Sequence, residues 1–139
     1  MKKILLTLVV VFGSLLLAAQ AQAQVVVIAN PSIKSADVSK NDLRDVFTGG
    51  SSSIGGSNAT PVLLKAGATS DEFLTVFIGK NDSAFRAGWR SLVFSGQASM
   101  PKTVDSETAM VDFVTRNAGA IGYISKATPH EGVKVLAVR

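Results

Sequence analysis

Apolar runs rich in β-branched residues alternate with segments of helical periodicity, and this alternation limits the possible folds more than any other feature. The first run, residues 25–29, reads Val-Val-Val-Ile-Ala and has the continuous hydrophobic character of a strand buried on both faces. Further apolar runs at residues 61–64, 121–124 and 133–138 predict three more strands. The intervening segments are long enough for helical crossovers, so the pattern indicates an α/β fold.

Helical spacing and capping residues predict four helices between these strands. Ser39 followed by Asp42, and Thr69 followed by Glu72, each have the spacing of a capping box. Gly119 is expected to be the C-cap of the last helix. We therefore expect helices over residues 40–47, 70–78, 82–94 and 105–117.

The order of these elements predicts a three-layer α/β sandwich with a mixed, mostly parallel sheet. The pattern leaves the strand order open. Residues 49–58, rich in Gly and Ser, and residues 95–102 are expected to be loops. Within the helix over 82–94, one face is expected to pack in the core. That face carries Phe85, Trp89, Leu92 and Val93.

Residues 1–23 have the pattern of a cleaved export signal. Met1-Lys2-Lys3 supplies a positive start, an apolar stretch covers residues 4–19, and Ala21-Gln22-Ala23 favours cleavage before Gln24. An uncleaved membrane anchor is the alternative, but the apolar stretch is shorter than the roughly 20 residues that span a bilayer. We expect a single domain over residues 24–139, periplasmic or secreted after cleavage.

Composition excludes several classes of function. The sequence contains no cysteine, which excludes disulfides, thiolate metal sites and cysteine nucleophiles. It has no run of Lys or Arg after residue 3 and an aromatic content of 6%, so we expect no nucleic-acid partner. His130 is the only histidine, and no Gly-x-Ser-x-Gly motif accompanies it. We therefore expect neither an enzyme nor a bound cofactor or metal.

One segment has the character of an anion site. Lys65 follows a predicted strand and precedes a helix that begins near Thr69 and Ser70. Free backbone N–H groups, the positive end of the helix dipole, two hydroxyls and an amine could together hold a small oxyanion. Asp71 and Glu72 lie in the same turn and oppose an anion, so ordinary helix capping is the alternative.

Three segments of the sequence together carry a family resemblance. They read Val-Ser-Lys-Asn-Asp-Leu-Arg-Asp-Val-Phe-Thr-Gly at 38–49, Trp-Arg-Ser-Leu-Val-Phe-Ser-Gly at 89–96, and Asp-Phe-Val-Thr-Arg-Asn-Ala-Gly-Ala-Ile-Gly-Tyr-Ile at 112–124. In this order they resemble phosphate ABC-transporter substrate-binding proteins. The Gly-Ala-Ile-Gly-Tyr element within the third segment is the most specific. The sequence looks most like short secreted relatives that keep one lobe of this type II periplasmic-binding-protein fold.

The resemblance implies a binding region as well as a fold. Members of the family close two lobes around phosphate with an arginine and a Ser-Gly-Thr turn. In this sequence Lys65 takes the place of the arginine, while Thr69, Ser70 and Asp71 fall on the turn. A lysine is a point charge and does not reproduce the bidentate fork of a guanidinium. The length corresponds to one lobe.

Two functions follow from this comparison. The first is capture of phosphate or another small oxyanion by Lys65, Thr69 and Ser70, linked to uptake through the membrane component of an ABC transporter. The second is a ligand-free interaction module that keeps only the fold. Its partner would be a protein of the cell envelope or a second copy of the chain.

Overall fold

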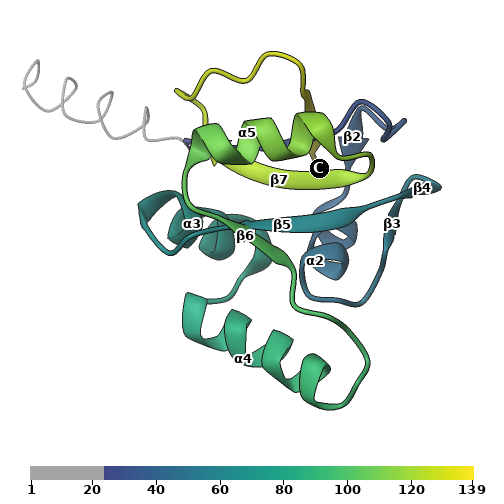
Figure 1. Cartoon of the computed structure of the whole chain (residues 1–139), viewed down its shortest axis with the longest axis vertical. Helices are drawn as coiled ribbons and strands as arrows, with labels where there is room; N and C mark the ends of the chain where they lie inside the picture. Colours follow the sequence, from purple (N-terminus) through teal and green to yellow (C-terminus); the bar gives the residue numbers. More distant parts are fainter. Residues whose placement is uncertain (1–23) are drawn as a thin grey trace, which may run out of the picture.

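A six-stranded sheet forms the centre of the molecule, which a computed structural model describes for residues 24–139 (Figure 1). The strand order is β2-β8-β1-β7-β5-β6. The strands are β1 (Val25–Ala29), β2 (Asp37–Val38), β5 (Thr60–Leu64), β6 (Lys102–Val104), β7 (Ala120–Ser125) and β8 (Lys134–Val138). The export signal predicted over residues 1–23 lies outside the described residues.

Strand β1 runs against the other five strands. It pairs antiparallel with β7 on one side and with β8 on the other. The pairs β2–β8, β5–β6 and β5–β7 are all parallel. The prediction of a mixed, mostly parallel sheet is confirmed, and the carboxyl ends of β5, β6 and β7 meet at one edge.

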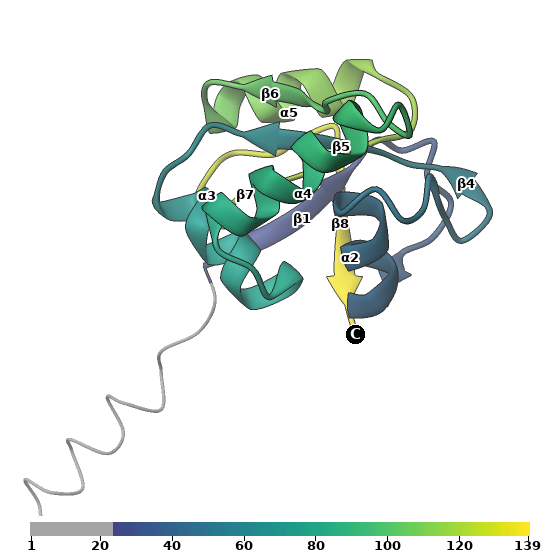
Figure 2. The same ribbon diagram turned by 90° about the horizontal axis from the view of Figure 1, so that it is seen from below.

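Helices cover both faces of this sheet, which confirms the predicted α/β sandwich (Figure 2). Helix α5 lies on one face, and the other helices lie on the opposite face. The helical elements are α2 (Lys40–Phe47), α3 (Ala68–Phe73), the π-helix η1 (Leu74–Ile78), α4 (Asp82–Phe94) and α5 (Glu107–Arg116). No helix within residues 24–139 is both long enough and apolar enough to cross a membrane.

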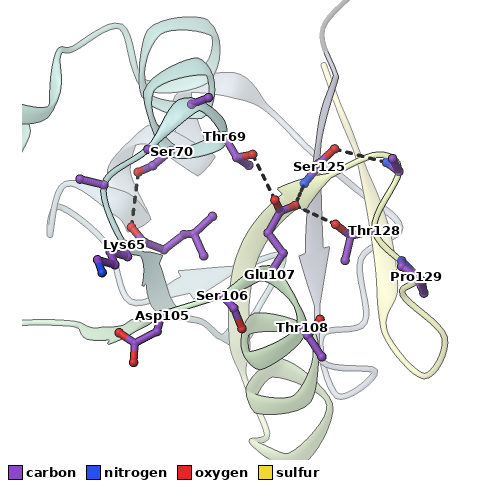
Figure 3. Close-up of a pocket in the computed structure, with 15 residues that line it drawn as sticks. Lys65, Thr69, Ser70, Asp105, Ser106, Glu107, Thr108, Ser125, Thr128 and Pro129 are labelled. Carbon is purple, nitrogen blue, oxygen red and sulfur yellow. Dashed lines mark hydrogen bonds between the residues drawn. The ribbon is translucent and has the colours of Figure 1, made fainter.

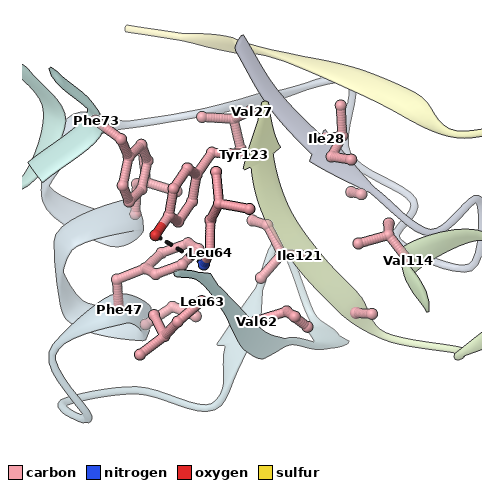
Figure 4. Close-up of a cluster of buried hydrophobic side chains, with 14 of the residues drawn as sticks. Val27, Ile28, Phe47, Val62, Leu63, Leu64, Phe73, Val114, Ile121 and Tyr123 are labelled. Carbon is pink, nitrogen blue, oxygen red and sulfur yellow. Dashed lines mark hydrogen bonds between the residues drawn. The ribbon is translucent and has the colours of Figure 1, made fainter. Parts of the chain in front are cut away.

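The two faces of β7 show how each helical layer packs. The ring of Tyr123 stacks on Phe73 of α3 with centroids 3.9 Å apart, and Phe47 of α2 meets Phe73 edge-on at 4.9 Å (Figure 4). On the opposite face, Gly122 lets α5 approach closely. A Cβ at this position would lie 2.4 Å from Sδ of Met110. An aromatic residue and a glycine, adjacent in β7, therefore set the spacing of the two layers.

Asn30 joins the end of β1 to the end of α5. Its side-chain amide donates to the carbonyls of Val114 at 2.8 Å and Thr115 at 3.1 Å. Its side-chain oxygen accepts from the backbone N–H of Ser32 at 2.9 Å. The last turn of a helix leaves carbonyls without intrahelical partners, and this buried amide satisfies two of those carbonyls.

One predicted cap is confirmed and two are wrong. Ser39 is the N-cap of α2 and its hydroxyl accepts from the backbone N–H of Asp42 at 3.0 Å. Helix α3 begins earlier than predicted, with Gly67 as its N-cap, because the hydroxyl of Thr69 binds a different partner, Glu107. Helix α5 ends at Arg116 and its C-cap is Asn117, so Gly119 is not its cap.

The predicted loops and the predicted apolar face also need correction. Residues 49–58 contain a small hairpin of β3 (Ser53–Ile54) and β4 (Ser57–Asn58). The segment predicted as a loop over 95–102 leads directly into strand β6. On α4, Phe85 and Trp89 are buried as predicted, whereas Val93 is 41% exposed because the helix end projects beyond the sheet.

Candidate functional site

An open pocket of about 610 Å³ lies at the edge where β5, β6 and β7 end (Figure 3). Its walls are the turn from β5 into α3, the turn from β6 into α5, and the segment that follows β7. In open α/β sheets, ligands bind outside the carboxyl ends of the strands. The position of the pocket therefore follows from the sheet topology, and its chemistry depends on the residues that line these three turns.

The three residues predicted as a site all line this pocket, but their side chains lie in different environments. Lys65 is exposed, and its side chain forms no ion pair or hydrogen bond with any residue of 24–139. Its amine is therefore available to an anion. It lies on the opposite side of the pocket from Glu107 (Figure 3).

Ser70 is 2% exposed, and its hydroxyl bonds to the protein interior. Its Oγ donates to the carbonyl of Leu64 at 3.4 Å and lies 3.1 Å from the phenolic oxygen of Tyr123. The same phenolic oxygen accepts from the backbone N–H of Leu64 at 3.0 Å. Burial raises the pKa of the Tyr123 hydroxyl above its ordinary value. The Ser70 hydroxyl thus ties α3 to the end of β5.

Thr69 directs its hydroxyl to the carboxylate of Glu107, the first residue of α5. Thr69 Oγ1 donates to Glu107 Oε2 at 3.2 Å. Glu107 Oε1 accepts from the hydroxyl of Thr128 at 2.8 Å and from the backbone N–H of Ser125. Three donors, from α3, from the end of β7 and from the turn after β7, therefore converge on one carboxylate (Figure 3). Below, this set of Thr69 Oγ1, Ser125 N and Thr128 Oγ1 is called the donor cradle.

Sequence analysis did not identify Glu107. An acidic residue at the start of a helix is common and needs no further explanation. Its partners come from α3, from the end of β7 and from the turn that follows, at separations of 38, 18 and 21 residues. No local pattern relates these positions, so only the folded chain reveals the cradle.

The pocket is lined by charges of both signs. Lys65 supplies one amine, whereas Asp105 and Glu107 supply two carboxylates. His130 directly follows the lining residues Thr128 and Pro129 in sequence. Its Nδ1 is 2.7 Å from the backbone carbonyl of Thr128. Over residues 24–139, no three His, Asp or Glu side chains are close enough to hold a metal ion together.

The fold matches part of the fold of solved phosphate-transport binding proteins. The chain is similar to an ABC-type phosphate transport receptor from Vibrio cholerae, with a TM-score of 0.62, 17% identity and coverage of 83% of this chain and 46% of the receptor. It is also similar to PstS from Borrelia burgdorferi, with a TM-score of 0.58, 19% identity and coverage of 84% and 47%.

A substrate-binding protein from Clostridium perfringens, solved with bound phosphate, gives a similar match. Its TM-score is 0.62 and its identity 16%, with coverage of 83% of this chain and 44% of that protein. The chain thus spans less than half the length of these solved structures. No protein-family model and no curated protein matches the sequence. The comparisons confirm the resemblance predicted from the sequence at the level of the fold.

Proposed function

We propose that this chain is an exported binding domain that captures phosphate or another small oxyanion for uptake through an ABC transporter. The observation that carries the proposal is the free amine of Lys65 at the carboxyl edge of three parallel strands. The fold similarity to phosphate-transport proteins supports the same ligand class. The proposed activity is binding and release, with no chemical step.

Each predicted site residue has a role in this proposal. Lys65 supplies the positive charge, as a point charge without a fixed bonding direction. Thr69 supplies a hydroxyl once that hydroxyl is released from Glu107. Ser70 contributes its backbone N–H in the first turn of α3, because its hydroxyl is held by Tyr123 and Leu64.

The cellular setting is part of the proposal. Cleavage before Gln24 would release the domain into the periplasm, where the partner is the membrane component of a transporter. Mass spectrometry of the exported protein tests the first step. An N-terminus at Gln24 is expected, whereas a retained leader would contradict it.

Calorimetric titration with inorganic phosphate tests the ligand. Heat of binding that is reduced in Lys65→Met and unchanged in Lys34→Met is expected. Lys34 is the matched control because it follows β1, which runs antiparallel to β7. It therefore lies at the edge of the sheet opposite the carboxyl ends of β5, β6 and β7. A folded protein that gives no heat with millimolar phosphate would contradict the proposal.

A second function, a ligand-free interaction module, is favoured by two observations. Glu107 already occupies the donor cradle, and the end of α4 presents Phe94 at 94% exposure. An exposed aromatic residue on a helix end is typical of a contact surface. The partner would be an envelope protein or a second copy of this chain. Sedimentation and cross-linking of the wild type and of Phe94→Ser distinguish this function, since a monomer without partners contradicts it.

A further inference from the structure

We infer that the carboxylate of Glu107 is a built-in competitor of the bound oxyanion and sets the affinity of the pocket. The inference rests on the proposed function, since it concerns the same pocket. It assigns a role to Glu107 that neither capping nor charge at the helix start explains. A cap would satisfy N–H groups of α5 itself, but the donors of the cradle belong to α3, β7 and the turn after β7.

The donor cradle has the composition of an oxyanion site. Two hydroxyls and one backbone N–H are neutral donors, and they meet at the two oxygens of one charged acceptor. A carboxylate accepts hydrogen bonds without donating any, and an oxygen of phosphate can accept hydrogen bonds from the same donors. The donors therefore serve either Glu107 or an external oxyanion, because each hydroxyl or N–H proton makes one strong bond at a time.

Glu107 has an advantage in this competition because it belongs to the chain. Its carboxylate is held at the cradle by helix α5 and loses no translational freedom when it binds, whereas a free ion does. The external oxyanion must in addition approach a charge of its own sign. Both effects weaken binding in the wild-type protein, and both depend on this one side chain.

Asp105 separates the two effects. It lines the same pocket and carries the same charge, but it makes no hydrogen bond or ion pair with any residue of 24–139. Replacing Asp105 removes only repulsion, whereas replacing Glu107 removes repulsion and releases the donors. The pair Glu107→Ala and Asp105→Ala is therefore a matched comparison.

The experiment is calorimetric titration of both variants and the wild-type protein with inorganic phosphate. Glu107→Ala is expected to bind phosphate about tenfold more tightly than the wild type, as release of donors from a charge-assisted competitor implies. Asp105→Ala is expected to gain clearly less. In Glu107→Ala, phosphate should also move the backbone amide resonance of Ser125, which a purely electrostatic effect at a distance would leave nearly unchanged.

Each other outcome contradicts a specific statement. If the wild type binds phosphate and Glu107→Ala binds no more tightly, the inference is wrong and the proposed function stands. An equal gain in Asp105→Ala also overturns the inference, because charge alone then explains it. If no folded variant binds phosphate, the proposed function itself fails. Should Glu107→Ala not fold, Glu107→Gln decides in its place, with a smaller gain expected and no gain overturning the inference.

Discussion

The phenolic oxygen of Tyr123 lies 3.1 Å from the hydroxyl of Ser70, so a side chain of β7 bonds to the first turn of α3. Tyr123 also accepts from the backbone N–H of Leu64, and Ser70 donates to the carbonyl of the same residue. The three groups close a ring of hydrogen bonds beneath the pocket. This ring holds the turn that carries Lys65 and keeps the Ser70 hydroxyl bonded to Leu64 and Tyr123.

Removing the Tyr123 hydroxyl should destabilise the fold. Tyr123→Phe keeps the stacked ring but leaves the buried N–H of Leu64 without an acceptor and removes one of the two hydrogen bonds of the Ser70 hydroxyl. An unsatisfied buried group costs about 1–3 kcal/mol in the free energy of unfolding. Denaturation followed by the fluorescence of Trp89, the only tryptophan, measures the loss. Combining Tyr123→Phe with Ser70→Ala should cost less than the sum of the single changes, and strict additivity would contradict the ring.

Alkaline pH should destabilise the fold through the same residue. Burial raises the pKa of Tyr123, so the folded state holds its proton more tightly than the unfolded chain. The resulting stability is complete below the unfolded pKa of about 10 and is lost as pH rises through the folded pKa. Since Tyr123 is the only tyrosine, tyrosinate absorbance follows it directly. Titration of the folded protein at the ordinary pKa would refute this expectation.

A side chain at Gly119 should destabilise the fold more than one at a glycine with open space around it. Its φ is +78°, and a Cβ there would lie 2.9 Å from the backbone carbonyl of Asn58. Gly96 has a similar φ of +74° but nothing within 4 Å of the added atom. Gly96→Ala should therefore cost only the left-handed backbone, about 1–2 kcal/mol. Gly119→Ala should lower the melting temperature further, and equal effects would show that the contact with Asn58 is unimportant.

Asn30→Asp should be more damaging than its small change in shape indicates. The new carboxylate would face the carbonyl oxygens of Val114 and Thr115 without a proton to donate. We expect a loss of about 1–3 kcal/mol or more in the free energy of unfolding. Asn117→Asp is the control, because its amide also donates to a helix carbonyl, that of Phe113, but at an exposed position. Similar losses in both variants would contradict the role given to burial.

Lys65→Met should weaken phosphate binding about two- to fivefold, the range for an exposed ion pair. The difference between wild type and variant should shrink as salt is added, because the charge is exposed to solvent. Titrations at low and high ionic strength measure this. Lys34→Met, at the opposite edge of the sheet, should bind as the wild type does. If both variants lose affinity equally, the attraction comes from net charge and not from the pocket.

The elements with strong hydrophobic patterns could be predicted from the sequence. Residues 25–29 form β1, and the apolar run at 121–124 lies within β7, because both strands are buried on both faces. Strand β6 was missed because only Val104 of its three residues is buried. Residues 102–104 form a strand because they pair with β5, which is distant in sequence, and their own hydrophobic pattern does not indicate this pairing.

The candidate site could be predicted only in part, because its hydrogen bonds also depend on residues distant in sequence. Lys65, Thr69 and Ser70 follow one strand closely in sequence, so local reasoning placed them together. The directions of the hydroxyls depend on Tyr123 and Glu107, which lie 53 and 38 residues away. The capping-box pattern considers only hydrogen bonds of Thr69 within its own helix. In the structure its hydroxyl donates instead to the carboxylate of Glu107, which belongs to another helix.

The position of β1 between β7 and β8 has a consequence for how the protein is made. Both neighbours of β1, at residues 120–125 and 134–138, are synthesised long after residues 25–29. Removal of residues 134–138 would strip one side of β1 of its backbone partners at Val27, Ile28 and Ala29. The sheet can therefore close around β1 only after residue 138 has been synthesised, and nascent fragments that lack β7 and β8 should be cleaved readily by proteases.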